Sequence, residues 1–269
     1  MAETFGFFGG IDFSGAREPL STLWSALGHE GDGRLTIVSL RPHAFRADLA
    51  GYVVDGWRDG HAGREARILW GADFPFGLPF DVGRDIGAGV TWPELAAWVA
   101  DRPPNEIREA AGKTAKSLRA TDSGGPLAPL DMRLFKQTVE GIRWIHQLME
   151  DGEVSVRPQA PLPDAPVTLI EVYPTGAGQE LGLPRRRSPS RPGEARARAA
   201  ALRTFLDFAD ADAEALAVTL EDAWDATVAC LAAYLARDDL DQPFRITAAP
   251  RHEQLRCEGW SYRPPAALT

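Results

Sequence analysis

The chain has 269 residues with 29 Lys+Arg and 38 Asp+Glu, and the resulting formal net charge of −9 argues against strong non-specific binding to nucleic acid. Hydrophobic residues at 44% and charged residues at 25% lie close to the globular average, which excludes a wholly disordered chain. Two cysteines are too few for a disulfide framework or a four-ligand zinc site, and they suggest a reducing compartment. The first residues are acidic, unlike those of a signal peptide, and no apolar window is long enough for a membrane span, so we expect a cytoplasmic protein.

Four short apolar segments predict the β-strands of the chain. They cover residues 4–13, 34–41, 67–73 and 166–173. Turn-forming glycine or proline follows the first, third and fourth segments, which is where a buried strand is expected to end.

Apolar residues at helical spacing predict five helices. They cover residues 92–102, 105–119, 130–151, 193–209 and 219–236. Alanines at positions 226, 229 and 233 of the last helix allow it to approach a sheet closely. The pattern predicts a single α/β domain over residues 1–269. Within it, the mainly helical stretch at about 76–165, between the third and fourth predicted strands, is expected to be an insertion or cap.

Five acidic residues occupy positions where a carboxylate is costly. Asp12 and Asp73 each end an apolar strand, and Glu171 lies inside another. Asp222 and Asp225 are three residues apart on the last helix and therefore project from one face. If the strands share a sheet that this helix crosses, the five acids converge. Their repulsion is then relieved by Mg²⁺ or Mn²⁺, ions that take oxygen ligands and support phosphodiester hydrolysis.

Each acid also has a structural interpretation. Asp12 and Asp73 can shape their own turns, and Glu171 can pair with a buried arginine. Asp222 lies three residues after a threonine, at the spacing of a capping box, and acids favour the first turn of a helix. Asp225 lies beyond that turn, so it is the stronger metal-ligand candidate of the two.

Several short motifs occur in a fixed order along nearly the whole chain. They are GIDFSG at 10–15, GADFPFGLP at 71–79, EVYP at 171–174, EDAWDA at 221–226 and EGW at 258–260. Together they resemble the ribonuclease H-like predicted nuclease family known as domain of unknown function 429. The resemblance implies a mixed sheet with the first strand central, flanked by helices. It also implies metal ligands at Asp12, at Asp73 or Glu171, and at Asp225 with or without Asp222.

Arginines are the candidates for substrate contacts. Arg119, in the family-like motif RATD, is expected either to contact a phosphate or to form a surface ion pair. A basic run either guides a nucleic-acid backbone past the acids or is a solvated face. The run begins with Arg185, Arg186 and Arg187 and continues with Arg191, Arg196, Arg198 and Arg203.

The leading hypothesis is a nuclease that hydrolyses RNA or DNA with Mg²⁺ or Mn²⁺, using Asp12, Asp73, Glu171 and Asp225. One alternative is a phosphotransferase of the actin and sugar-kinase fold, because residues 10–15 resemble its first phosphate loop and 122–125 weakly resemble its second. The other is a non-catalytic binding protein that kept the fold. Stabilisation by Mg²⁺ alone favours the nuclease, and stabilisation that requires ATP favours the phosphotransferase. The oligomeric state stays open.

Overall fold

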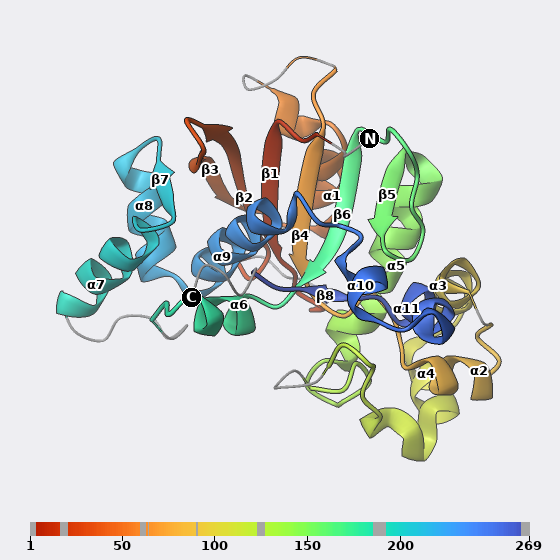
Figure 1. Ribbon diagram of the computed structural model, residues 1–269. Coiled ribbons are helices and arrows are strands. Elements are labelled where there is room, and N and C mark those ends of the chain that lie inside the picture. The colour runs from red at the N-terminus through yellow and green to blue at the C-terminus, as the bar shows by residue number, and fades with distance from the viewer. Residues whose placement is uncertain are drawn as a thin grey trace.

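The computed structural model shows a mixed sheet with helices on both faces (Figure 1). It describes residues 4–16, 21–59, 63, 65–89, 91–122, 127–184 and 192–264. In these ranges no helix has the length and apolar character needed to cross a lipid bilayer.

Eight strands form the sheet. They are β1 (Phe7–Asp12), β2 (Trp24–Gly31), β3 (Arg34–Pro42), β4 (Ile68–Asp73), β5 (Val154–Arg157), β6 (Val167–Val172), β7 (Leu206–Phe208) and β8 (Ser261–Tyr262). The order is β5-β6-β4-β1-β2-β3-β7, and β8 pairs with β6. The central strand β1 is antiparallel to β2 and parallel to β4, which is parallel to β6. The carboxyl ends of β1, β4 and β6 therefore meet at one edge of the sheet.

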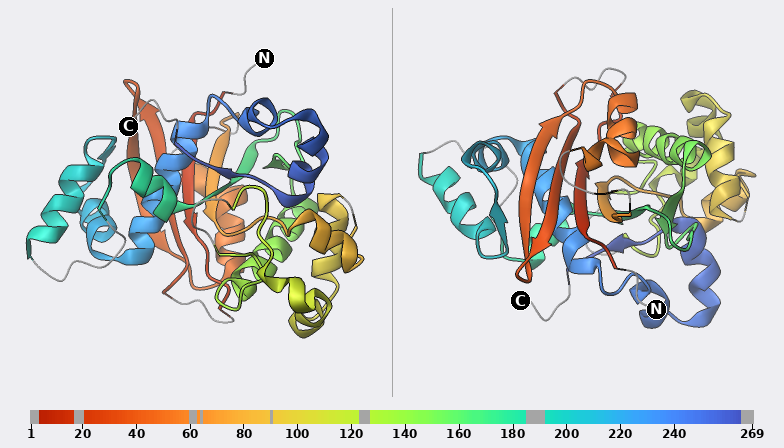
Figure 2. Two further views of the ribbon diagram at one scale, coloured as in Figure 1. Left: turned by 60° about the horizontal axis from the view of Figure 1, so that its bottom comes forward. Right: turned by 90° about the horizontal axis from the view of Figure 1, so that it is seen from above.

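Eleven α-helices accompany the sheet in the described residues. They are α1 (Arg46–Val54), α2 (Phe80–Asp85), α3 (Trp92–Ala100), α4 (Pro104–Ala111), α5 (Phe135–Asp151), α6 (Pro174–Glu180), α7 (Pro192–Leu202), α8 (Ala211–Thr219), α9 (Glu221–Ala236), α10 (Gln242–Ile246) and α11 (His252–Glu258). Short 3₁₀ turns occur at Gly56–Arg58, Gly112–Lys116 and Ala249–Arg251. Figure 2 shows α9 on one face of the sheet and α1 and α5 on the other.

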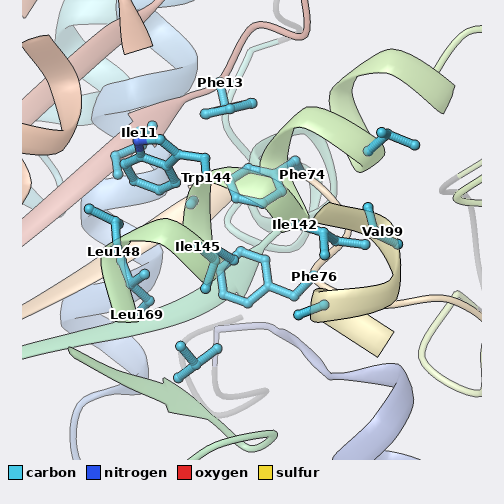
Figure 3. Close-up of a cluster of buried hydrophobic side chains, with 14 of the residues drawn as sticks. Ile11, Phe13, Phe74, Phe76, Val99, Ile142, Trp144, Ile145, Leu148 and Leu169 are labelled. Atoms are coloured by element: carbon cyan, nitrogen blue, oxygen red, sulfur yellow. The ribbon is translucent and has the colours of Figure 1, made fainter. Parts of the chain in front are cut away.

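Side chains that alternate along the strands divide the core into two layers. Ile11 packs with Trp144 of α5 in one layer, shown in Figure 3, and Phe8 packs in the other, against α9. Because residues two apart share a face of a strand, Asp12 lies on the same face as Phe8. Asp73 pairs with Asp12 in the parallel register of β4 and β1, so it also faces α9.

The four predicted strands are present as β1, β3, β4 and β6. The helix predicted over 193–209 is wrong at its end, because α7 stops at Leu202 and residues 206–208 form the edge strand β7. There Leu206 is fully buried and pairs with Leu35 of β3. Backbone partners offered by a distant strand outweigh the local helical pattern. The sequence analysis also missed β2 and β5.

The segment between β4 and β6 is mainly helical, with α2 to α5 followed by β5. The segment shares one core with the sheet, because Val99 of α3, Ile107 of α4 and Trp144 of α5 all belong to the layer that contains Ile11. β5 also extends the sheet beside β6. Within this segment, α2, α3 and α4 lie beside the sheet (Figure 1), and α3 packs against α5.

Candidate functional site

Two aspartates lie side by side where the central strands end. Asp12 ends β1 and Asp73 ends β4, and the two are direct partners in the parallel register. Asp12 is buried and Asp73 is half-buried. The apolar runs that precede them fix both strands in the core, so the two carboxylates meet at the carboxyl edge of the sheet.

A third aspartate reaches this edge because α9 touches the strands backbone to backbone. A Cβ atom on Gly10 of β1 would lie 2.0 Å from the carbonyl oxygen of Ala226, and one on Gly71 of β4 would lie 2.7 Å from that of Ala229. Only glycine allows this close approach. It places the buried Asp225, on the second turn of α9, next to Asp12 and Asp73.

Asp12, Asp73 and Asp225 each offer a carboxylate oxygen, and these three oxygens all lie within 4.8 Å of one another. Oxygens on opposite sides of a Mg²⁺ ion are roughly 4 Å apart and those around Ca²⁺ roughly 5 Å apart. Three close carboxylates repel unless a cation or a proton intervenes. Adjacent ligands of an octahedral Mg²⁺ ion are about 3 Å apart, so the donor set fits a hard divalent cation once the side chains close around it.

A cavity of about 560 Å³ opens beside these aspartates. Asp12, Asp73 and Asp222 line it, together with basic or polar side chains from the start of α5, among them Lys136 and Gln137. A cavity of this size accommodates a small-molecule ligand or a few units of a longer one. Acidic and basic groups thus face the same space.

Gln137 of α5 ties the ends of the two strands together. Its side-chain amide donates to the backbone carbonyl oxygens of Phe13 (2.9 Å) and Asp73 (2.6 Å). The two bonds fix the spacing of β1 and β4 where the aspartates project. Gln137 is a positioning residue that the sequence analysis missed, because nothing in its local sequence indicates this role.

Glu171 lies near the aspartates but outside their group. Its carboxylate accepts hydrogen bonds from Arg119 at 2.5 and 2.7 Å and from the backbone N–H of Phe76 at 2.8 Å. Burial raises the pKa of Glu171, and the charge of Arg119 opposes this rise. The structure therefore favours the buried ion pair considered for this residue and corrects its assignment as a metal ligand.

Arg119 lines the cavity beside the aspartates, but it is buried, so the ion pair expected at the surface is a buried one. All five N–H groups of its guanidinium have acceptors, on the carboxylates of Asp122 and Glu171 and on the carbonyl oxygen of Glu258. Burial lowers the pKa of Arg119, but the charges and hydrogen bonds of Glu171 and Asp122 raise it further, so the guanidinium stays charged.

Glu258 completes this buried network, although its EGW motif was given no role in the sequence analysis. Its carboxylate accepts hydrogen bonds from the backbone N–H groups of Phe80 (2.7 Å) and Ala120 (2.8 Å). The carboxylates of Asp122 and Glu171 and the main-chain carbonyl oxygen of Glu258 thus surround one guanidinium. We call these four residues the Arg119 network. It joins β6, α11 and the loop after β4.

The capping-box interpretation of Asp222 is wrong. Leu220 is the N-cap of α9, whereas the hydroxyl of Thr219 donates to the carbonyl oxygen of Ala215 in α8. Asp222 lies in the first turn of α9 and faces the cavity, outside the three-aspartate group.

The basic run does not form one exposed path. Arg185, Arg186, Arg187 and Arg191 lie outside the described residues. Farther along, Arg198 is buried over the ring of Trp224, and Arg203 forms an ion pair with Glu214 at 2.6 Å.

Comparison with known proteins identifies the family. The family model described as "Protein of unknown function (DUF429)" matches residues 10–245, and the chain belongs to this family. No curated protein matches the chain, and no solved structure matches it.

Proposed function

We propose that this DUF429 protein is a metal-dependent phosphodiester hydrolase, a nuclease that uses Mg²⁺ or Mn²⁺. The observation that carries the proposal is the group of three carboxylate oxygens from Asp12, Asp73 and Asp225, all within 4.8 Å, beside a cavity. Hydrolysis by bound divalent ions needs oxygen ligands and space for a phosphate, and both are present.

The fold supports an assignment to the ribonuclease H-like class. β1 is central, two acids end adjacent parallel strands, and a third comes from the helix that covers them. This arrangement supports the proposal because the sequence resemblance implies a metal site of strand and helix acids. In the proposal, α2, α3 and α4 form the cap beside the catalytic edge.

The residues of this chain have separate roles in the proposed reaction. Asp12, Asp73 and Asp225 hold the ion, which when bound activates water and stabilises charge on the phosphate. Asp222 faces the same cavity and orients water or a second ion. Gln137 keeps the two strand ends at a fixed spacing, and the Arg119 network holds the loop that follows Asp73.

Mg²⁺ binding tests the proposal without a known substrate. At about one hundred times the dissociation constant, Mg²⁺ should stabilise the wild-type protein by about 2.7 kcal/mol and raise its Tm by several degrees with no nucleotide present. Asp225→Asn should abolish both this shift and the cleavage of labelled RNA and DNA oligonucleotides. Without metal, the variant should be as stable as the wild type or more stable, because repulsion among the carboxylates falls.

Asp212→Asn is the matched control, since Asp212 is an exposed acid in the first turn of α8. It should keep the Mg²⁺ shift and the cleavage. A shift that appears only with ATP would replace the proposal with the phosphotransferase, and no shift with Mg²⁺ or Mn²⁺ would replace it with a binding protein. Marked destabilisation by Asp225→Asn would mean that this residue is architectural.

A further inference from the structure

A second cavity of about 640 Å³ adjoins the one beside the aspartates. It lies among α1, α4 and α5, and residues from all three helices line it. Gly15 and Lys136 line both cavities. Gly15 packs on the backbone of Lys136 and Gln137 so closely that a Cβ atom there would lie 2.3 Å from the Gln137 nitrogen, and this contact separates the two cavities. A strand that reaches from one cavity to the other would therefore pass over the exposed side chain of Lys136.

Basic side chains outnumber acidic ones in the second cavity by three to two, although the chain as a whole is acidic. Arg46, Arg108 and Lys136 line it together with Glu109 and Glu140. The carboxylate of Glu140 is shared by Arg46 at 3.0 Å and by Arg143 of α5 at 2.8 Å. Its charge is thus compensated, and the remaining groups leave the cavity positive.

Two of these cations are available to a ligand. Lys136 and Arg108 are exposed, and within the described ranges no residue forms an ion pair with either. The guanidinium of Arg108 lies 4.3 Å from the ring centre of Phe135, which holds it in place by a cation–π contact. A guanidinium held in this way can bind a phosphate or stack on a base.

Arg46 has a different task. Its guanidinium donates to the backbone carbonyl oxygens of Ser14 (3.3 Å) and Ala16 (2.6 Å) in the loop after β1. These bonds hold the loop, which contains Gly15, between the two cavities. Arg46 therefore shapes the passage, whereas Lys136 and Arg108 supply accessible positive charge.

We propose that the second cavity binds the backbone of a single-stranded polynucleotide next to the phosphate that is cleaved. The inference rests on the proposed function and names its substrate class, a polynucleotide rather than a mononucleotide. One phosphate lies at the aspartates, Lys136 binds a neighbouring phosphate, and Arg108 binds the strand beyond it. A positive groove beside an acidic metal site offsets the repulsion between the acids and the substrate.

Binding without catalysis tests the inference. We would measure the anisotropy of fluorescein-labelled 12-nucleotide DNA and RNA with the Asp225→Asn protein, in EDTA, over a range of salt concentrations. Lys136→Glu combined with Arg108→Glu should weaken binding of the 12-mers at least tenfold. Lys136→Gln and Arg108→Gln should each reduce the slope of log affinity against log salt by about 0.7. A dinucleotide should bind far more weakly than the 12-mers.

Arg251→Glu combined with Arg256→Glu is the charge-matched control, because both arginines are exposed and line neither cavity. Equal weakening by this control would overturn the inference, as would unchanged binding in the Lys136 and Arg108 variants with an unaltered Tm. A difference in affinity between the RNA and DNA 12-mers would support the proposal and would indicate whether the substrate carries ribose or deoxyribose. If Mg²⁺ does not raise the Tm of the wild-type protein, the metal centre is refuted, but the binding of the 12-mers to the second cavity is not affected.

Discussion

Two groups of carboxylates lie at the same edge of the sheet: the three aspartates of β1, β4 and α9, and the Arg119 network. They differ in what surrounds each carboxylate. Asp73 ends β4, and Glu171 lies one register position away on the neighbouring strand β6. Glu171 is neutralised by a guanidinium at hydrogen-bond distance. The three aspartates instead converge within 4.8 Å beside a cavity.

The difference teaches that an acid in an apolar strand is not by itself a sign of catalysis. What distinguishes the two regions is the group brought to each carboxylate by distant parts of the chain. Arg119 and the backbone N–H of Phe76 donate to Glu171, whereas α9 adds a further acid to Asp12 and Asp73. The Arg119 network stabilises loops, whereas the three aspartates bring like charges together, as a cation site requires.

Removal of Arg119 tests the architectural side of this comparison and has the largest expected effect. Arg119→Ala leaves the carboxylates of Glu171 and Asp122 buried without their counter-charge, and we expect the free energy of unfolding to fall by about 3–5 kcal/mol. Urea denaturation measures it. Arg251→Ala, at an exposed position, should change it by less than about 0.5 kcal/mol.

If Arg119→Ala does not fold, Arg119→Lys keeps the charge but not the five donors, and it should lose part of the same stability. A loss below about 1 kcal/mol in Arg119→Ala would mean that the network contributes little, and the contrast between the two regions would disappear.

The pH dependence of the free energy of unfolding tests a third buried group, the imidazole of His43. Burial and the nearby charge of Arg41 lower the pKa of His43 to about 4 from its usual 6.5, and its ring bonds the hydroxyl of Ser25 at 2.8 Å. The unfolded chain binds this proton first as pH falls. The free energy of unfolding should therefore drop between pH 6.5 and pH 4, by up to about 3 kcal/mol.

His43→Gln, which can keep the bond to Ser25, should abolish most of this drop in denaturation curves recorded from pH 7 to pH 4. His29→Gln, at a partly exposed position, is the control and should retain it. A slope that does not change in His43→Gln would mean that other groups cause the acid sensitivity.

Gln137 gives the smallest expected effect on stability and separates positioning from folding. Gln137→Leu removes two hydrogen bonds to the strand ends, so we expect a loss of about 1 kcal/mol in the metal-free protein. Mg²⁺ affinity, followed by calorimetry, should fall about tenfold because the aspartates lose their fixed spacing. Gln147→Leu, at an exposed position of the same helix, should change neither quantity.

An Mg²⁺ affinity that stays constant in Gln137→Leu, with the stability loss present, would make this residue purely structural. The strand ends would then be held at the required spacing by the sheet alone.

The sequence by itself determined the buried strands β1, β3, β4 and β6 and the close approach of α9, because apolar runs and small residues act locally. It also showed which carboxylates lie in apolar segments, where burial requires a counter-charge or a cation. Only the tertiary structure decided which partner each received. A guanidinium 52 residues away in the chain reaches Glu171, α9 brings Asp225 to Asp12 and Asp73, and the edge of β3 recruits β7. Spacing along the chain carries no information about such encounters, since they depend on how the packed elements bring distant side chains together.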